Sequence, residues 1–371
     1  MLFFSRFKRR SGSICFQKNR ARRRKSEPCL HKRGDLLKVN LLIYTPPSIS
    51  LPVNEACNLG AAASLHWQTG RAVKNMLFLL GGLTLLMMLP ATGSAGSARD
   101  YLNAPINTWL TFYNVGYNTS VTPEDGLDIT SRIRANVLSQ SVVVTRAMDY
   151  WGRTGGISLV LPYIYLEASS DAFSASNQGF SDLSFLWQMN IFGGPALSKE
   201  QFRSFVPGPF ASFHFFVGTP LGTYDPTRTL NPSSHRWTFF PTINYSYTPD
   251  QGWTWLEAYC SGKLFTKNAD YRVANASKLT QKPLLLVEGH ASRNVTPSFW
   301  LSTDLYYEVG GETSIDGVGQ RDAADTLRLG AGMGLRIWAG TDVILNYERV
   351  VVKPVGQPDA QTIRMTIRRL W

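Results

Sequence analysis

The sequence predicts an all-β protein, specifically a transmembrane antiparallel up-and-down β-barrel of about 12 strands. Three observations lead to this fold class. An apolar run resembling an export signal precedes the body of the chain, the body alternates apolar and polar residues with the two-residue period of a strand, and its connections alternate between long and short. Outer-membrane barrels alternate long extracellular loops with tight periplasmic turns, whereas a soluble β-sandwich has no reason to show that asymmetry.

Residues 1–75 form a basic leader. Lys and Arg outnumber Asp and Glu by 15 to 3 there, whereas both classes number 23 in residues 76–371, so the whole net charge of +12 lies in the leader. Because the body has no net basic charge, we expect no nucleic-acid partner. A translation start at Met76, with the leader wrongly assigned or disordered, is the simplest interpretation. A cytoplasmic extension or an organellar presequence are the alternatives.

Residues 76–98 are typical of a secretory signal peptide. Arg71 and Lys74 supply the positive flank, an apolar stretch too short for a stop-transfer helix follows, and Gly96-Ser97-Ala98 gives a small-x-small cleavage site. The sequence therefore predicts an exported barrel domain over residues 99–371.

Twelve strands can be placed in the exported region. The long connections between them are expected outside the cell, at 220–235, 266–281 and 309–325. Short connections at 248–252, 292–297 and 338–341 are expected in the periplasm. A further turn, 192–208, is long enough for a short helix around 198–205. The strands are predicted at 107–119, 136–147, 156–166, 181–191, 209–219, 236–247, 253–265, 282–291, 298–308, 326–337, 342–351 and 361–371.

The last strand must pair with the first, because an open sheet edge in lipid would leave backbone N–H and C=O groups unpaired. Apolar residues share one parity of this strand, and Arg369 interrupts that face. The pattern resembles the C-terminal signature that outer-membrane assembly machinery recognises, so this machinery and membrane lipid are the expected partners. The signature residues are Ile363, Met365, Ile367 and Trp371.

Charged residues on the inward parity are the candidate site. Either they form a structural network of paired charges inside the barrel, or they line a permeation path. Arg328 and Arg336 share one strand with three intervening glycines and are expected toward opposite ends of the pore. The candidates are Asp182, Glu257, Lys263, Asp304, Glu308, Arg328, Arg336, Glu348, Arg364 and Arg368.

An enzyme is the alternative from another class, because some twelve-stranded outer-membrane barrels are lipases. The exported region has three histidines, His214, His235 and His290, but no Gly-x-Ser-x-Gly and no paired metal-ligand spacing. We therefore expect no catalytic residues, no metal and no cofactor. A purely structural surface barrel is the third possibility, since the loops contain no recognisable ligand motif.

Several short segments resemble a known family. Asp100-Tyr-Leu-Asn-Ala-Pro105, Gly179-Phe-Ser-Asp-Leu183 and Pro220-Leu-Gly-Thr-Tyr-Asp225 are similar to segments of the outer-membrane transporter family linked to the meta-pathway of phenol degradation. Gly252-Trp253 and Asn268 also fit its pattern. The resemblance covers residues 100–371 and implies a barrel in the outer membrane of a Gram-negative bacterium. It further implies a passive route for a small-molecule solute that is hydrophobic or aromatic.

Overall fold

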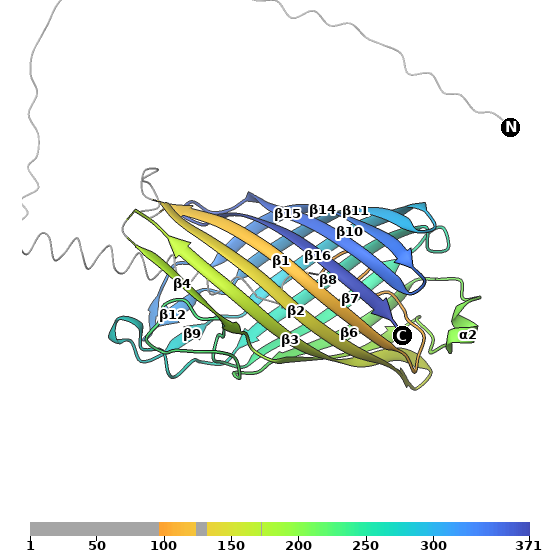
Figure 1. The fold of residues 1–371 in the computed structure, drawn as a ribbon, viewed down its shortest axis with the longest axis horizontal. Helices are drawn as coiled ribbons and strands as arrows, with labels where there is room; N and C mark the ends of the chain where they lie inside the picture. The colour runs from red at the N-terminus through yellow and green to blue at the C-terminus, as the bar shows by residue number, and fades with distance from the viewer. Residues whose placement is uncertain (1–95, 124–131, 172) are drawn as a thin grey trace, which may run out of the picture. The chain divides into compact units, whose positions relative to one another are not determined.

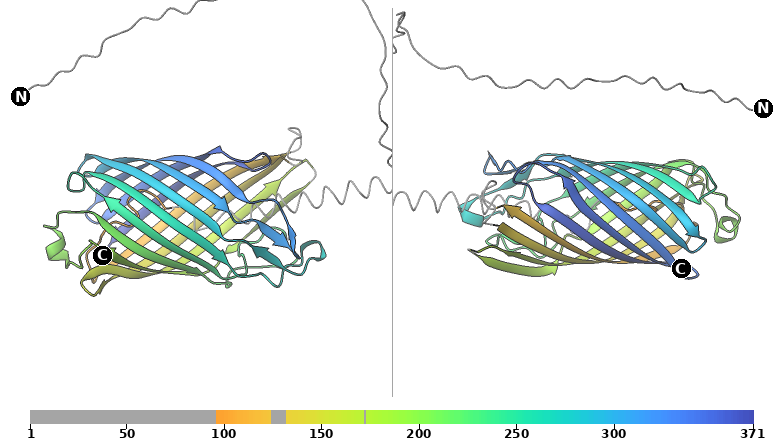
Figure 2. Two further views of the ribbon diagram at one scale, coloured as in Figure 1. Left: turned by 180° about the vertical axis from the view of Figure 1, so that it is seen from behind. Right: turned by 90° about the horizontal axis from the view of Figure 1, so that it is seen from above.

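A computed structural model of the protein describes residues 96–123, 132–171 and 173–371. The predicted leader and all but the last three residues of the predicted signal peptide lie outside the described residues. All of the described residues belong to the same compact unit. They form an antiparallel sheet that closes on itself, with steeply tilted strands (Figures 1 and 2).

The barrel wall contains twelve strands, one of them interrupted. β4 and β5 pair in succession with the two ends of β3 and together occupy one place in the ring. The wall is built from β1 (Trp109–Pro123), β2 (Arg132–Tyr150), β3 (Arg153–Ser169), β4 (Ser174–Phe180), β5 (Ser184–Phe192), β6 (Phe210–Gly218), β7 (Thr238–Tyr247), β8 (Thr254–Phe265), β10 (Leu284–Thr296), β11 (Phe299–Gly310), β14 (Ala324–Trp338), β15 (Thr341–Val352) and β16 (Asp359–Leu370).

The ring closes where the first strand meets the last, as the sequence predicts. β1 pairs antiparallel with β16, from Leu110 opposite Leu370 to Val121 opposite Asp359. On its other edge β1 pairs with β2, so neither of its edges is open. The predicted all-β, twelve-stranded barrel is therefore confirmed, with strand ends that differ by a few residues.

The alternation along β8 shows why these segments form a membrane barrel. Glu257 and Lys263 are buried in the interior, whereas Leu256, Cys260 and Leu264 are exposed on the outer surface. Because successive side chains of a strand point to opposite faces, one residue type can meet lipid while the next fills the lumen. The sheet is thus apolar outside and polar inside, the reverse of a soluble barrel.

The two ends of the barrel differ. At one end, loops fold into a small sheet of β9 (Leu279–Gln281), β12 (Thr313–Ile315) and β13 (Val318–Gly319), of which Figure 1 labels β9 and β12. The short helix η1 (Val273–Asn275) packs against this sheet through Val273. This sheet is absent from the sequence prediction, which treats 266–281 and 309–325 as plain loops. The C-terminus and helix α2 (Lys199–Phe202) lie at the other end.

Helix α2 confirms the helix predicted in the long turn. Ser198 caps it: its Oγ accepts a hydrogen bond from the Gln201 backbone N–H, and the Gln201 side chain accepts one from the Ser198 N–H. This reciprocal pair satisfies two N–H groups that a helix start otherwise leaves unpaired. No helix in the described part of the chain is long and apolar enough to cross a membrane.

Exposed aromatic side chains lie near the strand ends. Amphipathic rings of this kind favour the two membrane interfaces, which lie about 25 Å apart on a barrel of this class. Their positions agree with a sheet that spans the apolar layer. The exposed tryptophans are Trp109, Trp151, Trp237, Trp253, Trp338 and Trp371.

Candidate functional site

The interior of the barrel holds two cavities that meet in the middle. The lower chamber, of about 330 Å³, lies toward the short-turn end, and the upper chamber, of about 240 Å³, lies toward the looped end. We call the residues that line both chambers the waist. The waist consists of Asn118, Val137, Phe216, Phe240, Arg328, Glu348 and Thr362.

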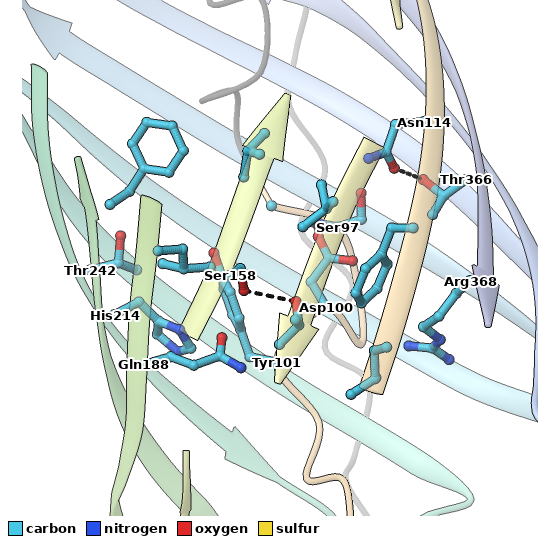
Figure 3. A pocket seen from close by; sticks show the side chains of 18 of the residues that line it. Ser97, Asp100, Tyr101, Asn114, Ser158, Gln188, His214, Thr242, Thr366 and Arg368 are labelled. Carbon is cyan, nitrogen blue, oxygen red and sulfur yellow. Dashed lines mark hydrogen bonds between the residues drawn. The ribbon is translucent and has the colours of Figure 1, made fainter. Parts of the chain in front are cut away.

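Residues 96–104, which precede the first strand, enter the lower chamber and form what we call the plug. The Tyr101 ring lies beside that of His214 (Figure 3), with the two ring centroids 3.9 Å apart. The centroid of the Tyr259 ring lies 4.9 Å from that of Tyr101. Asn103 donates a hydrogen bond to the Pro195 carbonyl at 3.1 Å and accepts one from the Asn190 amide at 3.0 Å. The plug is therefore held by several strands of the wall.

Arg99 is the main anchor of the plug. Its backbone N–H donates to Glu257 Oε2 at 2.8 Å, its Nε to Ser292 Oγ at 2.8 Å and its Nη1 to Asn294 Oδ1 at 2.6 Å. The guanidinium carbon also lies 4.9 Å from the centroid of the Trp300 ring. Arg99 has a φ of 68°, a left-handed conformation that is uncommon outside glycine. These four contacts over-determine the conformation and hold it in place.

The next residue, Asp100, lines the lower chamber and is exposed to its lumen (Figure 3). Its carboxylate accepts a hydrogen bond from the Ser97 backbone N–H at 2.7 Å. Arg364 also donates to Ser97 Oγ at 3.3 Å. The predicted lumen residue Arg364 thus lies against the plug.

At the waist, three predicted site residues meet. Arg328 Nη2 lies 3.2 Å from Glu308 Oε1, and its Nη1 lies 3.5 Å from Glu348 Oε1. The guanidinium carbon lies 5.2 Å from the centroid of the Tyr306 ring. The group joins β11, β14 and β15, so Arg328 sits between the chambers. The expectation that it lies toward one end of the pore is therefore wrong.

Arg336 lies at the short-turn rim, where its side chain is 57% exposed and its Nε is 3.2 Å from Asp342 Oδ1. The bulge at the end of β14 comes after the pair of Arg336 with Asp342, so Arg336 keeps the inward parity. It is exposed because it lies two residues from the end of the strand, at the mouth of the barrel. Arg368, from the lower chamber, lies 2.7 Å from the other oxygen of the same carboxylate. Asp342 thus links a rim arginine to a lumen arginine.

The glycines between Arg328 and Arg336 leave little free space in the lumen, although they have no side chains. A Cβ at Gly334 would lie 2.2 Å from the Trp300 ring, and one at Gly332 would lie 2.5 Å from Asn346 Nδ2. Large neighbours fill the places that the missing side chains would occupy. These glycines therefore accommodate packing against the wall.

Asp182 lies in the break between β4 and β5, not within a strand as predicted. Its carboxylate accepts hydrogen bonds from the Ser233 hydroxyl, from the Ser234 backbone N–H at 2.9 Å and from the Ser234 hydroxyl at 2.7 Å. The Gly222 N–H adds a longer bond of 3.3 Å. Asp182 therefore ties the loop before β7 to the upper chamber.

A buried acid–histidine cluster also lies on the inward face. His290 Nδ1 is 2.7 Å from Asp304 Oδ1, and its Nε2 is 3.5 Å from Glu288 Oε2. Glu288 and His290 are missing from the predicted site, although they share the inward parity of β10 with Ser292. The same alternation that identifies Asp304 could have included them.

The nearest arrangement to a nucleophile and base is Ser212 with His214. Ser212 Oγ lies 2.7 Å from His214 Nε2, but Asn244 Oδ1 approaches the same nitrogen at 2.8 Å. His214 Nδ1 has no hydrogen-bond partner among the described residues, so no third group orients the ring as a base requires. His235 lies in a loop, stacked on Tyr224. The geometry favours a packed polar cluster over a catalytic one.

A metal site is also not apparent: within the ranges that the structure covers, no three His, Cys, Asp or Glu side chains are placed to hold an ion.

Residues 118–352 match the model of the family described as "Putative MetA-pathway of phenol degradation". No curated protein sequence matches the chain. Among solved structures, the chain is similar to an outer membrane channel from Pseudomonas putida F1, at 17% identity and a TM-score of 0.65, over 75% of this chain and 100% of that one. The two proteins share the fold.

Two weaker structural similarities accompany it. The β domain of the Bordetella autotransporter BrkA is 10% identical with a TM-score of 0.46, over 71% of this chain and 100% of that one. A Pseudomonas aeruginosa FadL homologue is 7% identical with a TM-score of 0.37, over 72% and 90%.

Proposed function

Because this chain belongs to the family described as the MetA-pathway of phenol degradation, we propose that it is an outer-membrane channel of a Gram-negative bacterium that admits small apolar or aromatic molecules passively. The observation that supports this most directly is the upper chamber. An apolar cavity of about 150 Å³ takes up benzene, so about 240 Å³ has room for one substituted ring. Its apolar lining includes Ile164, Leu166, Phe216, Phe240, Phe265, Leu284 and Val350.

Single-channel recording in planar bilayers tests the proposal. Neutral aromatic molecules cross lipid unaided, so the informative measurement is the interruption of ion current by a solute inside the channel. We expect benzyl alcohol to interrupt the current at lower concentration than a sugar of similar size. Phe240→Ser should weaken this effect, whereas Phe239→Ser, on the outward parity of the same strand, should not. An ion current that both solutes leave unchanged would contradict the proposal, and a barrel without current would indicate a purely structural role.

We also propose that the assembly machinery and lipid are partners of this chain, through its C-terminal strand. Ile363, Ile367 and Trp371 are exposed on the outer surface, and Met365 is partly exposed. Trp371 Nε1 donates to Thr111 Oγ1 at 3.0 Å, across the seam with β1. The arrangement leaves the apolar parity available to lipid while the terminal aromatic fixes the seam.

We further propose that export removes a signal peptide. The sequence alone predicts cleavage after Ala98; because of the contacts of residues 96–98, we propose instead that cleavage follows Ala95 and that the mature chain begins at Gly96. Small-x-small triplets end at both Ala95 and Ala98. Ala98 is fully buried in a cluster with Trp300, and Ser97 bonds to Asp100, so removal of residues 96–98 would cost these contacts. Intact-mass measurement of the native protein should give a start at Gly96. A start at Arg99 would support the later site, and one upstream of Met76 would contradict export by this signal.

Removing the plug should raise the channel's conductance severalfold, because residues 96–104 line and narrow the lower chamber. Arg99→Ala removes the side-chain contacts of the anchor with Ser292, Asn294 and Trp300. This variant should show brief openings with the same conductance as the channel that lacks the plug. Both are measured as single-channel current. Arg203→Ala, on the exposed turn after α2, is the matched control. Equal conductance with and without the plug would show that the lower chamber does not limit the current.

A further inference from the structure

The upper chamber contains a buried arginine with unused donors. Arg236 is 6% exposed, and its Nη2 donates to Gln281 Oε1. Its Nε and Nη1 have no hydrogen-bond partner among the described residues. The guanidinium carbon lies 4.5 Å from the centroid of the Phe265 ring. A cation is therefore held against an aromatic wall, and two of its nitrogens are buried without a hydrogen-bond acceptor in the described part of the chain.

Lys263 is a second buried cation that lies against an aromatic ring in the same chamber. It is 6% exposed, and its Nζ lies 5.0 Å from the centroid of the Phe240 ring. No carboxylate of the described residues lies within 4.0 Å of its Nζ. Lys263 and Phe265 share the inward parity of β8, about 7 Å apart along the strand. The two cations thus follow one another along the same wall.

The acidic residues of the upper chamber are engaged elsewhere. Glu308 and Glu348 pair with Arg328, and Asp182 accepts its hydrogen bonds from the serines of the loop. Asp182 attracts Arg236 and Glu308 attracts Lys263, but neither carboxylate forms an ion pair with its cation within 4.0 Å. A buried cation without a directly bonded counter-ion is unfavourable, so an anion entering the chamber would be stabilised by both side chains. The same wall offers aromatic and aliphatic surface to a ring.

We propose that the upper chamber is a binding site for aromatic anions, with an aromatic carboxylate such as benzoate as the simplest member of the class. Arg236 and Lys263 bind the carboxylate in turn, and the ring packs against Phe216, Phe240 and Leu284. This rests on the proposed channel function and adds the charge of the solute to it. A neutral aromatic alcohol has the ring but lacks the charge that the two cations select.

The test compares benzoate with benzyl alcohol, which is neutral and similar in size, as blockers of single-channel current. Benzoate should block the native channel at a concentration at least about tenfold lower, the factor expected for one charge-assisted hydrogen bond. The double variant Arg236→Gln with Lys263→Met should lose that difference. Arg236→Lys should retain part of it, and Lys278→Met, on an exposed loop, should retain it fully.

The outcomes separate this inference from the function on which it rests. Equal block by benzoate and benzyl alcohol in the native channel overturns the anion site and leaves a channel for neutral aromatics. Absence of block by either solute overturns both. Heat-modifiability on gels identifies variants that have not folded, and the native-channel comparison decides the question even if the double variant fails to fold.

Discussion

Replacing Arg328 with alanine is expected to destabilise the barrel by about 3–5 kcal/mol, the usual cost of removing one partner from a buried ion pair. The change removes the cation that forms ion pairs with Glu308 and Glu348 at the waist. The free energy of unfolding, measured by urea titration of the protein refolded into lipid vesicles, checks this result. This expectation differs from the behaviour of an unpaired pore-lining residue, whose replacement would alter flux alone.

Two controls test the cause. Adding Glu308→Gln and Glu348→Gln to Arg328→Ala removes both carboxylate charges and should restore much of the lost stability. Arg336→Ala should change the unfolding free energy by less than about 1 kcal/mol, because its pair with Asp342 is exposed to solvent. If Arg328→Ala is no more harmful than Arg336→Ala, the waist cluster does not contribute to stability as described.

Placing an arginine on the lipid face of the same strand should also impair the barrel. Leu329 is 48% exposed and Met333 44% exposed on the outer surface near the middle of β14. A charge at the bilayer midplane costs roughly 2–4 kcal/mol, so Leu329→Arg or Met333→Arg should lower the folded fraction in vesicles. The folded fraction is read from heat-modifiability on gels.

The matched control is Val355→Arg, in the loop between β15 and β16, where a new charge meets water. It should fold as the native chain does. Tolerance of Leu329→Arg together with failure of Val355→Arg would mean that the strand faces the other way. The lumen residues proposed on its opposite parity would then lose their support.

The sequence predicts the strands well because the signal for them is local. Alternation of apolar and polar residues specifies which face of a strand a residue occupies, and it places Glu257 and Lys263 in the lumen. It does not specify register between strands. Tyr306 lies opposite Arg328, and Gly330 lies opposite Glu348, so the waist cluster depends on the alignment of three separate strands. The alternation of residues within one strand carries no information about how that strand is aligned with its neighbours.

The plug could not be located from the sequence for a different reason. Residues 96–104 mix small, charged, aromatic and aliphatic side chains with no strand or helix period, which is typical of an ordinary loop. Their position depends on distant partners, since Arg99 contacts residues more than 150 positions away in the chain. Asp182 shows the same limit, because its inward position depends on hydrogen bonds to a remote loop.

The plug is joined to β1 by only residues 105–108, and this short tether has a kinetic and thermodynamic consequence. A segment on a short linker experiences an effective concentration in the millimolar range at its own binding site. After leaving the lower chamber, the plug therefore rebinds against little competition from free molecules at that end of the barrel. A free peptide with the sequence of residues 96–104 would have to reach millimolar concentration to displace the plug. The plug of the same chain, and not a diffusible ligand at lower concentration, therefore determines whether the lower chamber is occupied.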